Sequence, residues 1–240
     1  MKFALDMHTH TIASGHAYNT IMEMARAAAD RGLEALGITE HGPSIAGTCD
    51  EIYFKNLKVV DRRLYGVRLF LGAEMNIVNY DGGLDLSDSA QRHLDVGIAG
   101  IHHGYYTAGS IRENTQAYIK AIENPMVDII SHPDDGRIPV DYEQLALAAR
   151  ENQVLLELNN SSLQPTNARY AGHSEDCIRR LLEQCEKYGT AVILSSDAHF
   201  CSAVGVFTQV EEFALKAGFP ERLIVNDSVQ RVLPFLHKYR

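Results

Sequence analysis

Seven short apolar runs alternate with helical patterns along the 240-residue chain, and this rhythm constrains the fold more than any other feature of the sequence. The runs span residues 3–8, 33–39, 67–73, 94–101, 126–131, 154–158 and 191–194. Helices are expected over 20–31, 50–64, 115–123, 141–151, 174–188, 208–217 and 228–238, with a small hairpin at 81–83. Strands that alternate with helices form parallel sheets with right-handed crossovers. Seven such units predict an α/β fold, a closed or nearly closed barrel.

The composition is that of an ordinary globular protein with an excess of acidic residues. Hydrophobic residues make up 45% of the chain, and we expect one domain over residues 1–240 that buries a core without disulfides. The formal net charge of −9 argues against a nucleic-acid surface, which needs a basic patch. The sequence shows neither an apolar signal segment nor a run that could span a membrane, so we expect a cytoplasmic protein.

Potential metal ligands follow six of the seven apolar runs, at the point where each run ends. These ligands are His8, His10, His41, Glu74, His102, His132, Asp197 and His199, and His16 follows in a Ser-Gly loop after the first run. A lone histidine usually lies on the surface or in a satisfied core, and a His-x-His motif alone is weak evidence. In a parallel barrel, however, the carboxyl ends of all strands meet at one end. Random scatter does not place so many ligands there, so the sequence predicts a polynuclear metal site.

The chemistry of this ligand set favours two or three ions. Seven imidazoles and two carboxylates exceed one tetrahedral zinc, which takes about four ligands. Glu74 and Asp197 are the natural bridges, because each carboxylate has two oxygens. Imidazole-rich sites suit zinc, iron or manganese rather than calcium or magnesium. The ions would make the pocket positive and attract a compact anion such as phosphate, and a hydroxide held between ions about 3.5–4 Å apart suits attack at phosphorus.

Other polar residues near the same edge could contact a substrate or the ligands. Asn159, Asn160 and Ser196 could donate hydrogen bonds to phosphate oxygens, and the loop cations Arg137 and Arg169 could do the same. Four further residues could support the site: Asp6 as a hydrogen-bond partner of a ligand imidazole or a buried capping group, His103 as a residue that points away from His102 and could contact a ligand, and Glu40 and Asp134 as proton carriers or solvated carboxylates.

The motifs in combination resemble those of the PHP (polymerase and histidinol phosphatase) superfamily, and most nearly the YcdX-type phosphatases. The matching segments are Asp6-Met7-His8-Thr9-His10-Thr11, Thr39-Glu40-His41-Gly42, Gly72-Ala73-Glu74, Gly100-Ile101-His102, Ser131-His132-Pro133 and Ser196-Asp197-Ala198-His199, with residues 11–18 and 156–162 as further matches. The resemblance runs from about residue 4 to the C-terminus. It implies a distorted TIM-like (β/α)7 barrel, phosphoesterase activity and a trinuclear centre, usually zinc.

The resemblance also implies how the ligands divide among three ions. One ion would be held by His8, His10, Glu74 and Asp197, a second by Glu74, His102 and His132, and a third by His16, His41 and His199. We therefore expect about three Zn²⁺ per chain, with Mn²⁺ or Fe²⁺ as alternatives.

The leading hypothesis is a metal-dependent phosphatase acting on a small phosphorylated metabolite, a phosphate monoester. A histidinol-phosphate phosphatase, a phosphodiesterase or exonuclease, and an accessory module that binds metal without turnover stay open as alternatives. An amidohydrolase-type barrel commonly uses a metal-ligating lysine, and no lysine stands at the end of an apolar run here.

Overall fold

A barrel of parallel strands forms the centre of the computed structural model, which describes residues 1–164 and 173–240. Within these residues seven parallel strands pair in the order β1-β2-β4-β5-β6-β7-β8, and the short β3 pairs antiparallel with β4. The strands are β1 (Leu5–Asp6), β2 (Ala35–His41), β3 (Arg63–Leu64), β4 (Val67–Asn76), β5 (Val96–Gly100), β6 (Ile129–Ile130), β7 (Leu155–Asn159) and β8 (Val192–Ser195). The predicted seven-stranded α/β barrel is confirmed.

The first and last strands come together without a full ladder, so the barrel is nearly closed. Thr9 and Ala198 form a parallel bridge beyond the two strands, and the His10 backbone N–H donates to the Ala198 carbonyl over 2.9 Å. At the other end the buried Asn226 amide joins β1 to β8. Its Nδ2 donates to the carbonyls of Leu5 (3.3 Å) and Leu194 (2.7 Å), and its Oδ1 accepts from the Leu194 N–H (2.8 Å).

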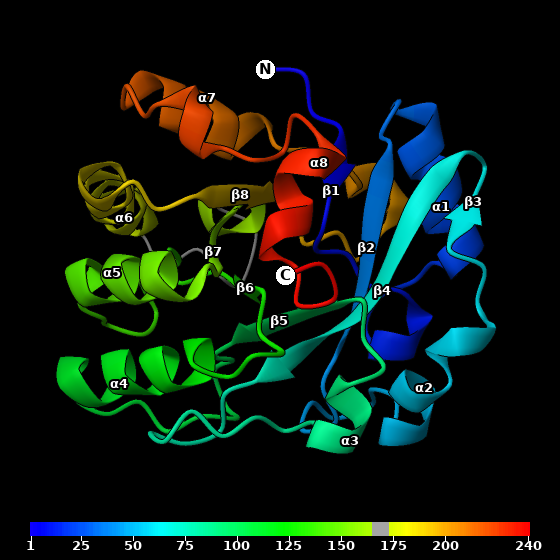
Figure 1. Cartoon of the computed structure of the whole chain (residues 1–240), viewed down its shortest axis with the longest axis horizontal. Helices are drawn as coiled ribbons and strands as arrows, with labels where there is room; N and C mark the ends of the chain where they lie inside the picture. Colours follow the sequence, from blue (N-terminus) through cyan, green and yellow to red (C-terminus); the bar gives the residue numbers. More distant parts are fainter. Residues whose placement is uncertain (165–172) are drawn as a thin grey trace.

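Helices surround the strands on two sides (Figure 1). They are α1 (Ile21–Asp30), α2 (Glu51–Lys55), α3 (Asp88–Gln91), α4 (Ile111–Ile122), α5 (Tyr142–Asn152), α6 (Ser174–Tyr188), α7 (Thr208–Lys216) and α8 (Val229–Val232). In Figure 1, α4, α5, α6 and α7 lie on one side of the barrel and α1 and α2 on the other. Capping boxes fix where α1 and α4 begin, because Thr20 pairs with Glu23 and Ser110 with Glu113.

Three predicted helices have different limits in the structure. The helix expected over 50–64 is the short α2 followed by a 3-10 turn at Leu57–Val59 and then β3, because α2 ends at Asn56. The helix expected over 115–123 begins four residues earlier, at Ile111, since Ser110 caps it. The helix expected over 228–238 is only α8 plus a 3-10 turn that contains Pro234, a residue without the N–H that would continue the helix.

The C-terminal segment plugs the end of the barrel at which the strands begin. In Figure 1, α8 and the C-terminus lie in the middle of the ring of strands. The apolar interior packs strand residues against this segment: Leu5, Met7, Ala35, Phe70, Val96, Ile98, Ile129, Leu155 and Ile193 against Val225, Val229, Val232 and Leu236. A larger apolar layer lies between the strands and the helices. The opposite end, where the strands finish, is therefore the one left for polar side chains.

The structure also bears on membrane insertion. Among the residues that it describes, every helix is too short or too polar to cross a bilayer.

Candidate metal centre

All nine predicted ligands converge at the carboxyl end of the barrel. His41 and Glu74 stand on β2 and β4, and the other seven lie on the segments that follow β1, β5, β6 and β8. Glu74 lies 2.8 Å from His41 Nδ1, 2.8 Å from His132 Nε2, 3.2 Å from His8 Nε2 and 3.3 Å from His102 Nε2. The remaining ligands continue the chain of contacts: His8 Nε2 to His10 Nε2 3.0 Å, His10 Nε2 to Asp197 Oδ1 3.1 Å, Asp197 Oδ1 to His199 Nδ1 3.5 Å, and His199 Nε2 to His16 Nε2 3.1 Å. The sequence pattern thus located one spatial cluster.

The two oxygens of Glu74 face different groups of imidazoles. Oε1 lies 2.8 Å from His132 Nε2 and 3.3 Å from His102 Nε2, and it accepts a hydrogen bond from the Ser131 hydroxyl over 2.9 Å. Oε2 lies 2.8 Å from His41 Nδ1, and it also faces His8 and His10. The side chain is fully buried. This is the arrangement of a carboxylate that can bridge two cation positions.

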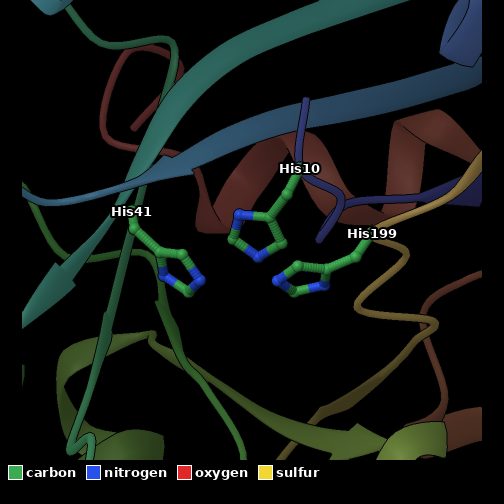
Figure 2. A group of neighbouring side chains, drawn as sticks. All are labelled: His10, His41 and His199. Carbon is green, nitrogen blue, oxygen red and sulfur yellow. The ribbon is translucent and has the colours of Figure 1, made fainter. Parts of the chain in front are cut away.

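Three groups within the cluster are compact enough to hold an ion. They are His8, His10 and Asp197; His41, Glu74 and His102; and His10, His41 and His199, each with ligand atoms within 4.8 Å of one another. Figure 2 shows the rings of the last group turned toward a shared space. The first group agrees with the expected division among three ions. The second contains His41 where His132 was expected, and the third contains His10 where His16 was expected. The division of ligands therefore stays a prediction.

The buried polar atoms fit divalent cations. Glu74 Oε2 accepts no hydrogen bond from the described residues, although three imidazole nitrogens lie within 3.5 Å of it. A buried anionic oxygen without directed donors is costly. The imidazole nitrogens lie close to this oxygen but do not point N–H groups at it. This geometry fits nitrogens whose lone pairs, like those of the oxygen, point at a common cation. The donor set of imidazoles and carboxylates is the one that zinc, manganese and iron prefer.

The surroundings keep two members of the cluster, Glu74 and His10, in forms that can bind cations. Burial would raise the pKa of Glu74, but His8, His102 and His41 hold it well below its usual range, so this carboxylate is an anion. Burial, with His41 and His199 as neighbours, lowers the pKa of His10 well below the usual value, so this imidazole is neutral. Burial opposes protonation of His8 too, yet the carboxylates of Glu157 and Glu74 raise its pKa.

A protein-family model identifies the family of the chain. The model described as "PHP domain" matches residues 6–164. The chain belongs to the PHP family. Two relatives named probable phosphatase are each 40% identical to it: one from Clostridium novyi over 236 residues (98% of this chain and 95% of the relative), and one from Acetivibrio thermocellus over 231 residues (96% and 94%).

Solved structures share the fold of this PHP domain. The histidinol phosphate phosphatase of Lactococcus lactis, solved with zinc, L-histidinol and phosphate, superposes with a TM-score of 0.63 at 18% identity, covering 90% of this chain and 94% of that one. A chain of an archaeal ribonuclease P, seen with mature tRNA, superposes with a TM-score of 0.58 at 15% identity, over 98% and 89%. At such low identity the likeness shows the barrel alone.

Glu157 on β7 supports the centre, although the sequence analysis assigned it no role. Its fully buried Oε1 lies 2.7 Å from His8 Nδ1, and its Oε2 accepts from the His132 backbone N–H over 2.7 Å. A ligand imidazole commonly donates its outer N–H to a carboxylate, which turns the inner nitrogen toward the metal. A charged residue in the middle of the apolar run 154–158 was the signal that could have found it.

Asp6 contacts backbone N–H groups and the Ser196 hydroxyl rather than a ligand ring. Its carboxylate accepts from the Ser196 hydroxyl, from the Gly205 N–H (2.8 Å) and from the His8 N–H (3.4 Å). Of the two roles considered for Asp6, these contacts agree with the buried capping group, because Asp6 ties the end of β1 to the loop that carries Asp197. Burial raises its pKa to about 6.

Two predicted ligands hold strained backbone conformations. His132 has φ +34° and Asp197 has φ +54°, in the left-handed region that non-glycine residues rarely occupy. Such conformations cost about 1–3 kcal/mol each and cluster at functional sites. The turn before His16 is held firmly as well: Gly15 has φ +81°, and a Cβ there would lie 2.3 Å from the Gly47 carbonyl oxygen. Glycine at this position therefore permits a close contact between the two loops.

A cavity of about 510 Å³ opens above the cluster. Its wall is lined by His16, His41, Ile45, Ala46, His102, His103, Tyr105, Arg137, Ser161, Asp197 and His199. Arg137 is held there by Asp135, with Nε 2.8 Å and Nη2 2.6 Å from Oδ2. His103 also lines the cavity, as do Tyr105 and Ser161, two residues to which the sequence pattern gave no role.

The other expected substrate contacts are placed differently. Asn160 Oδ1 accepts from the backbone N–H groups of Gln209 (3.0 Å) and Val210 (3.3 Å), at the start of α7, and the Ser196 hydroxyl donates to Asp6. The structure does not bring either side chain to the cavity wall. Asn159 Nδ2 donates to Asp197 Oδ2 over 3.2 Å, so it supports a predicted ligand. Arg169 lies outside the described residues.

Proposed function

We propose that this PHP domain is a metal-dependent phosphatase that hydrolyses small phosphate monoesters with three divalent ions, zinc above all and manganese or iron as alternatives. The observation that carries the proposal is the convergence of nine predicted ligand side chains at one open cavity, which five of them line. The names of the 40%-identical relatives point to the same chemistry.

One set of residues would hold the metal ions, and another, on the cavity wall, would bind the substrate. Divalent ions, when bound, would lower the pKa of a water molecule and neutralise charge on the phosphoryl group. Glu74 and Asp197 would hold those ions together, and the outer carboxylate of Glu157 would keep His8 turned inward. Arg137, already held by Asp135, could donate two hydrogen bonds to a phosphoryl or other anionic oxygen on the cavity wall.

The size of the cavity and the net charge of the chain favour a small substrate. A cavity of about 510 Å³ accommodates a metabolite, and the net charge of −9 disfavours a long nucleic acid. The location expected for a protein that acts on phosphorylated metabolites is the cytoplasm.

Hydrolysis assays on metal-replete and metal-stripped protein test the proposal. We expect hydrolysis of p-nitrophenyl phosphate by protein loaded with zinc, manganese or iron, slower hydrolysis of bis-p-nitrophenyl phosphate, and loss of both after chelation. Histidinol phosphate in the same panel tests the narrower alternative. Full activity with metal shown to be absent would refute a metal-dependent enzyme, and three bound ions without turnover of any ester would favour the accessory module.

A further inference from the structure

Glu40 is a fully buried carboxylate that lies beside the predicted metal ligands but is not one of them. It precedes His41 on β2. Its donors among the described residues are neutral: the Thr11 N–H (3.0 Å), the Thr11 hydroxyl (2.5 Å), the Ser14 hydroxyl (2.6 Å) and the Tyr53 hydroxyl (3.3 Å). A buried carboxylate whose donors are all neutral is expensive for a fold to keep. Three of these four bonds come from the turn between His10 and His16.

The hydroxyl of Ser14 links this carboxylate to a predicted ligand. Ser14 Oγ donates its one proton to Glu40 Oε2, and it accepts a hydrogen bond from the His41 backbone N–H over 3.0 Å. It also lies 3.1 Å from Nδ1 of His10. Because its only proton is committed to Glu40, Ser14 Oγ must accept from His10, so Nδ1 carries the hydrogen.

That assignment decides which nitrogen of His10 faces the centre. A neutral imidazole has one N–H, and with the proton on Nδ1 the lone pair stands on Nε2. Nε2 is the atom that lies 3.1 Å from Asp197 Oδ1 and 3.0 Å from His8 Nε2. The relay therefore presents His10 in the form that a metal ion requires.

We propose that Glu40 is a positioning residue, which acts through Ser14 to fix the tautomer of His10 and to hold the turn that carries His16 against β2. His8 receives the same support directly from Glu157, whereas His10 receives it through a hydroxyl. This inference rests on the proposed metal centre and adds to it a reason for a buried carboxylate that binds no ion itself.

Three variants separate this role from a merely structural one. Ser14→Ala removes the relay, and Glu40→Gln keeps the shape but replaces one acceptor oxygen by a donor. Tyr53→Phe is the matched control, because it removes a donor to the same carboxylate without touching Ser14. Zinc affinity of the metal-free proteins is measured by competition with a chromophoric chelator, together with thermal unfolding. Loss of an outer partner typically weakens metal binding about 10–100-fold, and we expect that change in the first two variants and less than about twofold in the control.

A second readout follows the tautomer itself. The imidazole ¹⁵N spectrum of the metal-free protein, with His10 assigned through its loss in His10→Gln, should report a proton on Nδ1 in the wild type and a mixture of tautomers in Ser14→Ala. Wild-type zinc affinity in both Ser14→Ala and Glu40→Gln, with only a lower unfolding temperature, would overturn the proposal. A wild type that binds zinc but cleaves no phosphate ester would refute the proposed function and still leave this comparison decisive.

Discussion

Two buried carboxylates at opposite ends of the barrel differ in how their oxygens are satisfied. At the plugged end, Asp128 accepts from the Gly97 N–H (2.9 Å), the His237 N–H (2.6 Å), His237 Nδ1 (2.8 Å) and Arg240 Nη2 (3.1 Å). At the open end, Glu74 Oε2 is surrounded by imidazole nitrogens and accepts no hydrogen bond from the described residues. Both side chains are fully buried.

The difference separates a carboxylate that stabilises the fold from one that is suited to binding metal ions. Asp128 is satisfied by directed donors and latches the C-terminal segment onto β6. Glu74 lacks directed donors on one oxygen, and the strained backbones of His132 and Asp197 lie near it, so that end stores unfavourable free energy. We therefore expect changes at the open end to alter metal content and turnover, and changes at the plugged end to alter stability.

The largest effect should come from Glu74→Gln. The amide keeps the size of the side chain but cannot bridge two cations with two anionic oxygens. Elemental analysis should show more than one equivalent of metal lost, and kcat/KM for a phosphate monoester should fall by roughly 1,000-fold or more, which corresponds to about 4 kcal/mol. Unchanged metal content in this variant would show that Glu74 does not bridge.

Asp128→Asn should give the opposite result. One oxygen becomes an NH₂ group that faces donors, and Arg240 loses its charge partner, so we expect the free energy of unfolding to fall by about 3 kcal/mol. For a chain of this size, that lowers the unfolding temperature by roughly 6–12 °C. Calorimetry checks the prediction, while metal content and kcat/KM measured well below the transition should stay at wild-type values. Loss of metal here would contradict the division between the two ends.

His16→Ala tests whether the most exposed predicted ligand holds its own ion. His16 contacts His199 but belongs to none of the three compact groups, and its ion would have only neutral imidazoles from the chain. We expect about one equivalent of metal to be lost, the circular dichroism spectrum to be kept, and kcat to fall about 100-fold. His103→Ala is the matched control, since His103 lines the same cavity without being a predicted ligand. Retention of all metal and most of the kcat in His16→Ala would favour a two-metal enzyme.

The sequence predicts the barrel and the ligand cluster because both depend on local patterns. Apolar runs separated by helices specify parallel strands, and parallel strands place whatever follows them at one end. His41, Glu74 and His132 could therefore be assigned to a common site although they are far apart in the chain. The pairing of their individual atoms could not be assigned, because it depends on rotamers within a crowded pocket.

Groups that support the site were harder to predict, since their partners are distant in sequence. Glu157 meets His8 across 149 residues, and Asp128 meets His237 across 109. Periodicity carries no information about such pairs. The break at Pro234 was readable in principle, because proline removes a helix donor. The end of α2 at Asn56 was not, since the apolar spacing continues through it.

The smallest expected effect comes from Arg137, on the cavity wall. This residue separates substrate binding from metal binding within the open end of the barrel. Asp135 holds the guanidinium in place, so a substrate anion would meet an ordered donor. Arg137→Gln should raise KM for a phosphate monoester about tenfold, equivalent to about 1.4 kcal/mol, with metal content unchanged and little change in kcat. Arg137→Lys keeps the charge but loses the forked geometry, so its KM should lie between those of the wild type and Arg137→Gln. Arg150→Gln, at an exposed position on α5, is the control. Steady-state kinetics on the four proteins decide the point: an unchanged KM in Arg137→Gln would remove Arg137 from substrate binding and leave its pairing with Asp135 as its role.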